Sequence, residues 1–186
     1  MDRAEQLVDR LCCVYRERGE RHYGENVSER EHALQTAHFA RQFGEADAIV
    51  VACLLHDVGH LLHDLGEHIA NAGVDARHED LGADALRGRL PDVIVEPIRL
   101  HVTAKRYLCW KDPRYLAGLS PASRLSLELQ GGVMSDDEAH EFERHPHFDG
   151  AVRVRRYDDM GKVAGLETDD FDSYRELICQ FARASG

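Results

Sequence analysis

The chain has 186 residues, of which 43% are hydrophobic, and a formal net charge of -11. This length suits one domain with a sizeable core, and no change in composition marks a boundary, so we expect a single domain over 1–186. The negative charge argues against sequence-independent nucleic-acid binding, which requires a basic surface. No apolar run reaches membrane-spanning length, the N-terminus does not resemble a signal peptide, and the five cysteines form no CxxC pair. We therefore expect a cytoplasmic protein without a membrane partner, either a monomer or a small homo-oligomer.

Helical periodicity runs through nearly the whole chain and strand signals are scarce, which predicts an all-α bundle. Two capping boxes of the form S-x-x-E, beginning at Ser28 and Ser135, mark helix starts. The predicted elements are an N-terminal helix over 4–18, a polar loop over 19–27, a bundle over 28–165 and a C-terminal helix over 171–184. Within the bundle, helices are predicted over 28–44, 47–62 and 92–105, and others begin near His78, Ser120, Ser135 and His147.

Two imidazoles and a carboxylate stand at the end of an apolar helical run, in the sequence Leu-Leu-His-Asp-Val-Gly-His over 54–60. If the helix continues, His56 and His60 lie one turn apart on one face, and Asp57 is rotated toward a second site. Burying an ionised aspartate is costly unless it is paired or binds a metal. The same residues also suit a helix end with a satisfied histidine and a solvated aspartate, so the motif alone leaves both interpretations open.

Six residues that can bind a metal fall near the ends of five predicted helices, with His56 and Asp57 on the same one, as a site inside a helical bundle requires. Two cations can share Asp57 as a bridge. Nitrogen and carboxylate ligands without a thiolate suit iron or manganese better than structural zinc, and they leave positions open for a substrate. One cation would take His32, His56 and Asp158, and the other would take His78 and His101.

Four segments, 31–35, 54–60, 101–108 and 127–132, resemble the mixed-valent diiron oxygenases of the HD-domain superfamily. The resemblance is strongest to those that cleave the carbon–phosphorus bond of 2-amino-1-hydroxyethylphosphonate, and it extends from residue 23 to residue 162. It implies an HD-domain helical bundle that binds two iron ions, Fe(II) and Fe(III), through the ligands above and uses O2 as co-substrate. It favours Asp158 over Asp159 as the final ligand, because Asp158 follows the aromatic Tyr157.

The resemblance also implies which residues bind the substrate. His60 and Lys105 would hold the phosphonate oxygens, with help from Ser123 or Ser126, and the catalytic residues would be Asp57, His60 and Lys105. An ammonium and an imidazolium beside the metals would complement a dianion. Alternatively, Lys105 is a solvated residue near a helix C-terminus and His60 only supports a metal ligand.

The loop before the first metal ligand would contact the other end of the substrate. By the same resemblance, Glu25 would bind an amino group and Tyr23 would lie over the metals, although His22 takes the tyrosine position in an ungapped alignment. The expected substrate is a small 1-hydroxyphosphonate, either 2-amino-1-hydroxyethylphosphonate or its N-methylated analogue. A quaternary ammonium group could contact an aromatic ring of the loop. The expected products are phosphate and a carboxylic acid such as glycine.

Two other functions are compatible with the same residues. A metal-dependent HD-domain phosphohydrolase would use them to activate water toward a phosphate ester or nucleotide. A non-catalytic sensor would bind a phosphonate or a metal without turnover. Iron content and oxygen dependence distinguish the oxygenase from the hydrolase, and turnover distinguishes both from the sensor.

Overall fold

Ten α-helices and three short 3-10 helices form the regular structure in the part of the chain that the computed structural model describes, residues 2–22, 24–66 and 69–184. These residues form one isolated β-bridge and no strand, which confirms the predicted all-α class. None of the helices found there is both long and apolar enough to cross a membrane. The α-helices are α1 (Arg3–Arg18), α2 (Glu29–Gln42), α3 (Asp47–Leu55), α4 (His78–Leu86), α5 (Asp92–Lys111), α6 (Pro113–Gly118), α7 (Pro121–Leu129), α8 (Asp136–Phe142), α9 (Phe148–Met160) and α10 (Arg175–Ala184). The 3-10 helices are η1 (Val58–Leu61), η2 (Ala70–Ala72) and η3 (Phe171–Tyr174).

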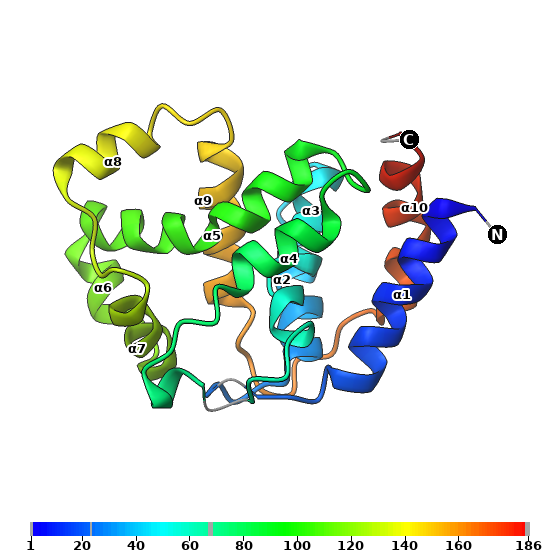
Figure 1. Cartoon of the computed structure of the whole chain (residues 1–186), viewed down its shortest axis with the longest axis horizontal. Coiled ribbons are helices and arrows are strands. Elements are labelled where there is room, and N and C mark those ends of the chain that lie inside the picture. Colours follow the sequence, from blue (N-terminus) through cyan, green and yellow to red (C-terminus); the bar gives the residue numbers. More distant parts are fainter. Residues whose placement is uncertain (1, 23, 67–68, 185–186) are drawn as a thin grey trace.

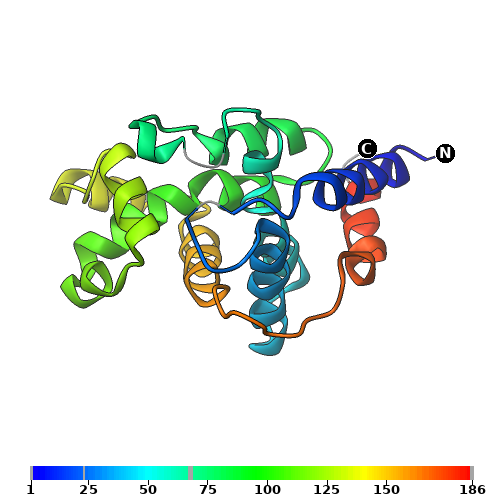
Figure 2. The same ribbon diagram turned by 90° about the horizontal axis from the view of Figure 1, so that it is seen from below.

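The long helix α5 crosses the centre of the molecule and contacts α3, α4 and α9 (Figure 1). Helix α2 packs against α3 and α9 and completes the bundle around the site. Helices α1 and α10 pair at one end, where both termini lie, whereas α6, α7 and α8 gather at the other end (Figures 1 and 2). The main hydrophobic core joins the α1–α10 pair to the bundle, and a smaller core surrounds the C-terminal half of α5.

The capping box at the start of α2 fixes the position of the first metal-ligand candidate. The Ser28 hydroxyl accepts a hydrogen bond from the Glu31 backbone N–H, and the Glu31 carboxylate accepts one from the Ser28 N–H at 2.8 Å. These two bonds satisfy backbone donors that have no partner inside the helix. The helix therefore begins at Glu29, and His32 lies in its first turn.

The predicted helix over 47–62 is wrong beyond Leu55. Helix α3 ends there, Asp57 has non-helical backbone angles (φ -103, ψ 11), and the chain continues as the 3-10 helix η1. The chain turns where Gly59 meets α4: a Cβ at Gly59 would lie 1.9 Å from the carbonyl oxygen of His78. This contact depends on a distant segment, so the local apolar pattern does not reveal it.

Other helix ends also differ from the predictions. Helix α5 continues past the predicted 92–105 to Lys111, because Tyr107 and Leu108 pack into the smaller core. Helix α6 is not predicted, and the first residues of the predicted helix 171–184 form the 3-10 helix η3. The differences affect the ends of helices and one short connecting helix, while the long helices occur where the periodicity places them.

Tyr15 links α1 to the end of α3. Its buried hydroxyl donates to the carbonyl oxygen of Leu54 at 2.9 Å, and this carbonyl belongs to the last turn of α3. We expect Tyr15→Phe to lower the free energy of unfolding by about 1–2 kcal/mol, because a buried hydrogen bond is lost. Urea denaturation followed by circular dichroism measures the change. Tyr107→Phe removes a hydroxyl that bonds the half-buried Glu143, so it should cost less; an equal loss would contradict the role of Tyr15.

Candidate metal centre

Four buried histidines from four elements meet in the middle of the bundle. His32 lies in the first turn of α2, His56 caps α3, His78 begins α4 and His101 lies within α5. Their Nε2 atoms form two close pairs: those of His32 and His56 are 3.2 Å apart, and those of His78 and His101 are also 3.2 Å apart. The histidines predicted as metal ligands are thus brought together in the two predicted groups.

The opposite ring nitrogens are held by the protein. The Nδ1 atoms of His32, His56 and His101 lie 2.8, 2.8 and 2.7 Å from backbone carbonyl oxygens. Because a carbonyl can only accept, each Nδ1 carries the hydrogen, and in the neutral ring each Nε2 presents a lone pair to the centre. His78 Nδ1 instead faces the Glu79 carboxylate at 3.4 Å. Such contacts orient metal-binding histidines in known sites.

Asp57 lies between the two histidine pairs. Its Oδ2 is 3.4 Å from the Nε2 of His32 and 3.2 Å from that of His56. Its Oδ1 is 3.2 Å from the Nε2 of His78 and 3.3 Å from that of His101. One carboxylate therefore presents one oxygen to each pair, which is the geometry that a bridging ligand requires.

These atoms fit two metal ions better than they fit hydrogen bonds alone. When both rings of a pair are neutral, as metal ligands must be, their facing lone pairs repel, whereas neighbouring ligands of an ion with metal–nitrogen bonds of about 2.1 Å lie roughly 3 Å apart. In addition, Asp57 Oδ1 is buried without a hydrogen-bond partner, which is uncommon in folded proteins. One ion beside each histidine pair, with Asp57 between them, would give all of these atoms a partner.

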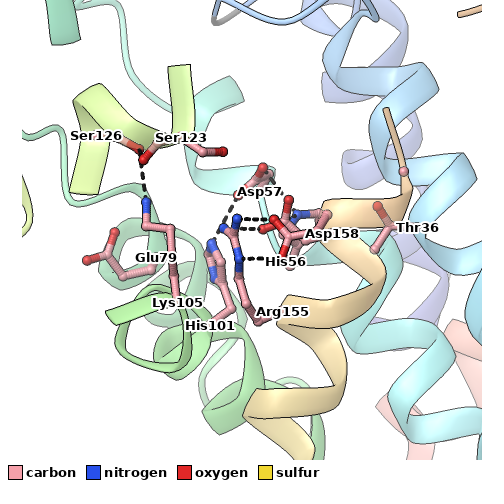
Figure 3. A network of polar contacts seen from close by, with 12 residues as sticks. Thr36, His56, Asp57, Glu79, His101, Lys105, Ser123, Ser126, Arg155 and Asp158 are labelled. Atoms are coloured by element: carbon pink, nitrogen blue, oxygen red, sulfur yellow. Dashed lines mark hydrogen bonds and ion pairs between the residues drawn. The ribbon is translucent and has the colours of Figure 1, made fainter. Parts of the chain in front are cut away.

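Asp158 extends the group around the first pair. Its Oδ1 is 3.3 Å from His32 Nε2, and its Oδ2 is 3.9 Å from His56 Nε2. Arg155, one turn earlier in α9, donates to Asp158 Oδ2 at 2.7 Å (Figure 3). It also donates to Asp159. Asp159 thus supports the arginine and is not directed toward the histidines. The neighbouring guanidinium orients Asp158 while one of its oxygens faces the centre.

Without metal, the charges of the site adjust to one another. Burial raises the pKa of Asp57, but the surrounding imidazoles outweigh burial and hold it well below its usual value. Burial lowers the pKa of His32, but Asp158 and Asp57 more than offset this and raise it to about 10. Burial lowers the pKa of His101. Both carboxylates are therefore ionised, and a bound cation would displace the proton that they favour on His32.

Two glycines allow elements of the site to approach one another. Gly59 meets the backbone of His78 in the contact described above, so a side chain there would push α4 away. A Cβ at Gly161 would lie 2.3 Å from the Thr36 hydroxyl oxygen, and the carbonyl oxygen of Gly161 accepts from His32. These close contacts place His78 and His32 at the centre.

A cavity of about 340 Å³ opens above the histidines, a size that suits a small molecule. Lys105 is buried in its wall and donates to the Ser126 hydroxyl at 2.9 Å (Figure 3). Burial and the nearby Arg155 lower the pKa of Lys105 to about 7. His60 also lines the cavity and stacks on His78, with ring centroids 3.9 Å apart. Burial holds the pKa of His60 well below its usual value, so the ring is neutral and is not the imidazolium expected from the sequence.

The loop before α2 covers one side of this cavity. Glu25 lines it, as do Ser123 and Ser126 of α7. The Glu25 carboxylate accepts hydrogen bonds from Lys162 at 2.8 Å and from Ser120 at 2.7 Å. The role predicted for Tyr23 lies outside the described residues.

Among the residues that line the cavity, Arg155, Lys162 and Glu29 were not predicted from the sequence although their charge bears on the site. Arg155 and Lys162 stand three residues before and four residues after Asp158, a spacing that brings side chains together on a helix and could have indicated them. Glu29 is buried and also lines the cavity. Burial and the Asp57 charge raise its pKa to about 8, so it is protonated at neutral pH. Glu29 lies within a capping box, and this sequence does not indicate that its side chain is buried or protonated.

Comparisons with known proteins agree with this geometry. The HD domain family matches residues 30–126. A hydroxymethylphosphonate dioxygenase of Gimesia maris is 44% identical over 176 residues, which cover 93% of this chain and 87% of the relative. The [1-hydroxy-2-(trimethylamino)ethyl]phosphonate dioxygenase (glycine-betaine-forming) of Leisingera caerulea is 40% identical over 173 residues, covering 92% and 88%. An uncharacterized protein of Acanthamoeba polyphaga mimivirus is 35% identical over 189 residues, covering 100% and 86%.

Proposed function

The chain belongs to the HD-domain family and, within it, to the phosphonate dioxygenases, and we propose that it uses O2 to cleave the carbon–phosphorus bond of a small 1-hydroxyphosphonate. The products are phosphate and the carboxylic acid formed from the hydroxyl-bearing carbon. The observation that carries this proposal is the position of Asp57, between two histidine pairs and below a cavity whose wall contains a buried lysine.

The reaction needs an oxidant because water alone would have to expel a carbanion from the carbon–phosphorus bond. Oxidation of the hydroxyl-bearing carbon allows phosphorus to leave as phosphate. Cleavage of the bond oxidises carbon and phosphorus by four electrons in total, and these electrons reduce one O2. Each product gains one oxygen atom. The enzyme is therefore a metal-dependent oxygenase, and its residues need only position the phosphonate and neutralise its charge.

The metal centre that fits these residues is a pair of iron ions, Fe(II) and Fe(III), held by the six predicted ligands. When bound, such a pair supplies Lewis acidity and electron transfer. His32, His56 and Asp158 would hold one ion, His78 and His101 the other, and Asp57 both. The two histidine pairs and the buried Asp57 oxygen between them support this assignment.

The substrate's phosphonate fits the side of the cavity formed by α5 and α7. Lys105 would place its ammonium against the phosphonate oxygens, and Ser126, which already bonds Lys105, would hold that ammonium in position. Neutral His60 can donate one hydrogen bond from its ring to a phosphonate oxygen. A charged hydrogen bond from a buried lysine supplies most of the attraction in such a site.

The proposal is tested with protein loaded anaerobically with ferrous iron. Phosphate release and oxygen uptake are recorded for hydroxymethylphosphonate, 2-amino-1-hydroxyethylphosphonate and its trimethylated analogue. We expect phosphate only in the presence of oxygen, in step with its uptake, from at least one of the three. Activity on phosphate esters without oxygen, and none on the phosphonates, would instead identify a phosphohydrolase.

A further inference from the structure

The outer part of the cavity contains a carboxylate whose partners come from the chain itself. Glu25 Oε1 lies 2.8 Å from Lys162 Nζ and 2.7 Å from the Ser120 hydroxyl. Lys162 Nζ also donates to the Ser123 hydroxyl at 3.1 Å and lies 3.8 Å from Asp158 Oδ1. The Lys162 and Glu25 side chains are only 19% and 23% exposed, so the pair is well shielded from solvent.

Three segments that are distant in the sequence meet at Lys162. It follows α9, its serine partner belongs to α7, and Glu25 comes from the loop before α2. The lysine ammonium lies against the Glu25 carboxylate as an ion pair, so the charge of Glu25 is already balanced.

A positively charged substrate group would compete with this lysine. Lys162 and Ser120 both bond Glu25 Oε1, so an ammonium that binds this oxygen would displace Lys162, and one that binds the other oxygen would lie beside Lys162 on a single carboxylate. In both cases two cations share one negative charge in a partly buried site. Like charges at short range, and a buried charge that loses its partner, both disfavour binding. A hydrogen or a small neutral substituent in the same place meets neither penalty.

We infer that the substrate carries no positive charge on the substituent of its hydroxyl-bearing carbon, and that the pairing of Lys162 with Glu25 sets this preference. The inference rests on the proposed function and narrows its substrate class to neutral 1-hydroxyphosphonates. It differs from the amino substrate that the sequence resemblance implies, because the chain itself supplies the cation beside Glu25.

A pair of substrates of matched size tests the inference. 1-Hydroxypropylphosphonate has a methyl group where 2-amino-1-hydroxyethylphosphonate has its ammonium, so their kcat/KM ratio reports charge and not size. We expect the wild-type enzyme to prefer the neutral compound by at least about tenfold. Lys162→Met, which leaves Glu25 without its cation, should shift the ratio toward the amine by at least about tenfold.

Lys111→Met is the matched control, because Lys111 is an exposed lysine that pairs with Glu143 away from the cavity, and it should leave the ratio unchanged. Lys162→Gln serves as a second variant if circular dichroism shows that the methionine variant does not fold. A wild-type enzyme that prefers the amine, or a ratio that both Lys162 variants leave unchanged, would overturn the inference. Absence of phosphate release from every phosphonate would count against the proposed function instead. Calorimetric binding of the same two compounds without oxygen would then still test the charge preference.

Discussion

Asp57→Ala should leave the protein without bound iron and without oxygen-dependent turnover. Asp57 places one oxygen within 3.4 Å of each imidazole in the first histidine pair and the other within 3.3 Å of each in the second. Removing it takes a ligand and a negative charge from both ions at once. Loss of a residue that only supports a ligand already lowers metal affinity about 10–100-fold, so loss of the bridge should cost more than about 100-fold.

Iron per chain, measured after anaerobic loading and desalting, checks this result. Asp64→Ala is the control, because Asp64 is an exposed aspartate nearby in the sequence that pairs with Arg18 and Arg21, and this variant should keep its iron. Circular dichroism of both metal-free variants establishes that they fold. Two iron ions per chain in Asp57→Ala would mean that the carboxylate does not bridge.

The sequence predicts the helices well because their signals are local. Apolar spacing identifies each long helix, and the capping box at Ser28 fixes the start of α2 and hence the position of His32. The signal that ends α3 is not local in the sequence. The apolar pattern continues through Leu61, but α3 ends at Leu55 and the chain turns so that Gly59 packs against the backbone of α4. That contact changes the position of His60, which stacks on His78 and does not lie one turn above His56.

The candidate metal ligands could be proposed from the sequence because histidines and carboxylates lie near the ends of separate predicted helices. The charges of the side chains in the cavity could not be predicted from the sequence, because they depend on burial and on neighbours from distant segments. Lys162 pairs with Glu25 although 137 positions separate them in the chain. In the sequence, Glu29 resembles an ordinary residue in the first turn of a helix, yet its side chain lines the cavity. Such residues become visible only once the segments are brought together.

Lys105→Met should raise the KM for a hydroxyphosphonate about a hundredfold, with a smaller effect on kcat and unchanged iron content. Lys105 is a buried cation in the cavity wall, where Ser126 holds its ammonium. Removing one member of a buried, hydrogen-bonded charge pair costs about 2–5 kcal/mol, and a hundredfold change corresponds to about 2.7 kcal/mol. Lys111→Met, on an exposed part of the same helix, is the control. An unchanged KM in Lys105→Met would place the phosphonate elsewhere.

The pH dependence separates the charge of Lys105 from its size. Its pKa is lowered to about 7, so the side chain of the free enzyme loses its proton as the pH rises through neutrality. Only the protonated form attracts a phosphonate dianion, and the advantage of wild type over Lys105→Met in kcat/KM should therefore be largest below pH 7 and should shrink above it. Taking the ratio of the two enzymes at each pH cancels the titration of the substrate itself. A ratio that stays constant between pH 6 and pH 8.5 would show that Lys105 acts through packing and not through its charge.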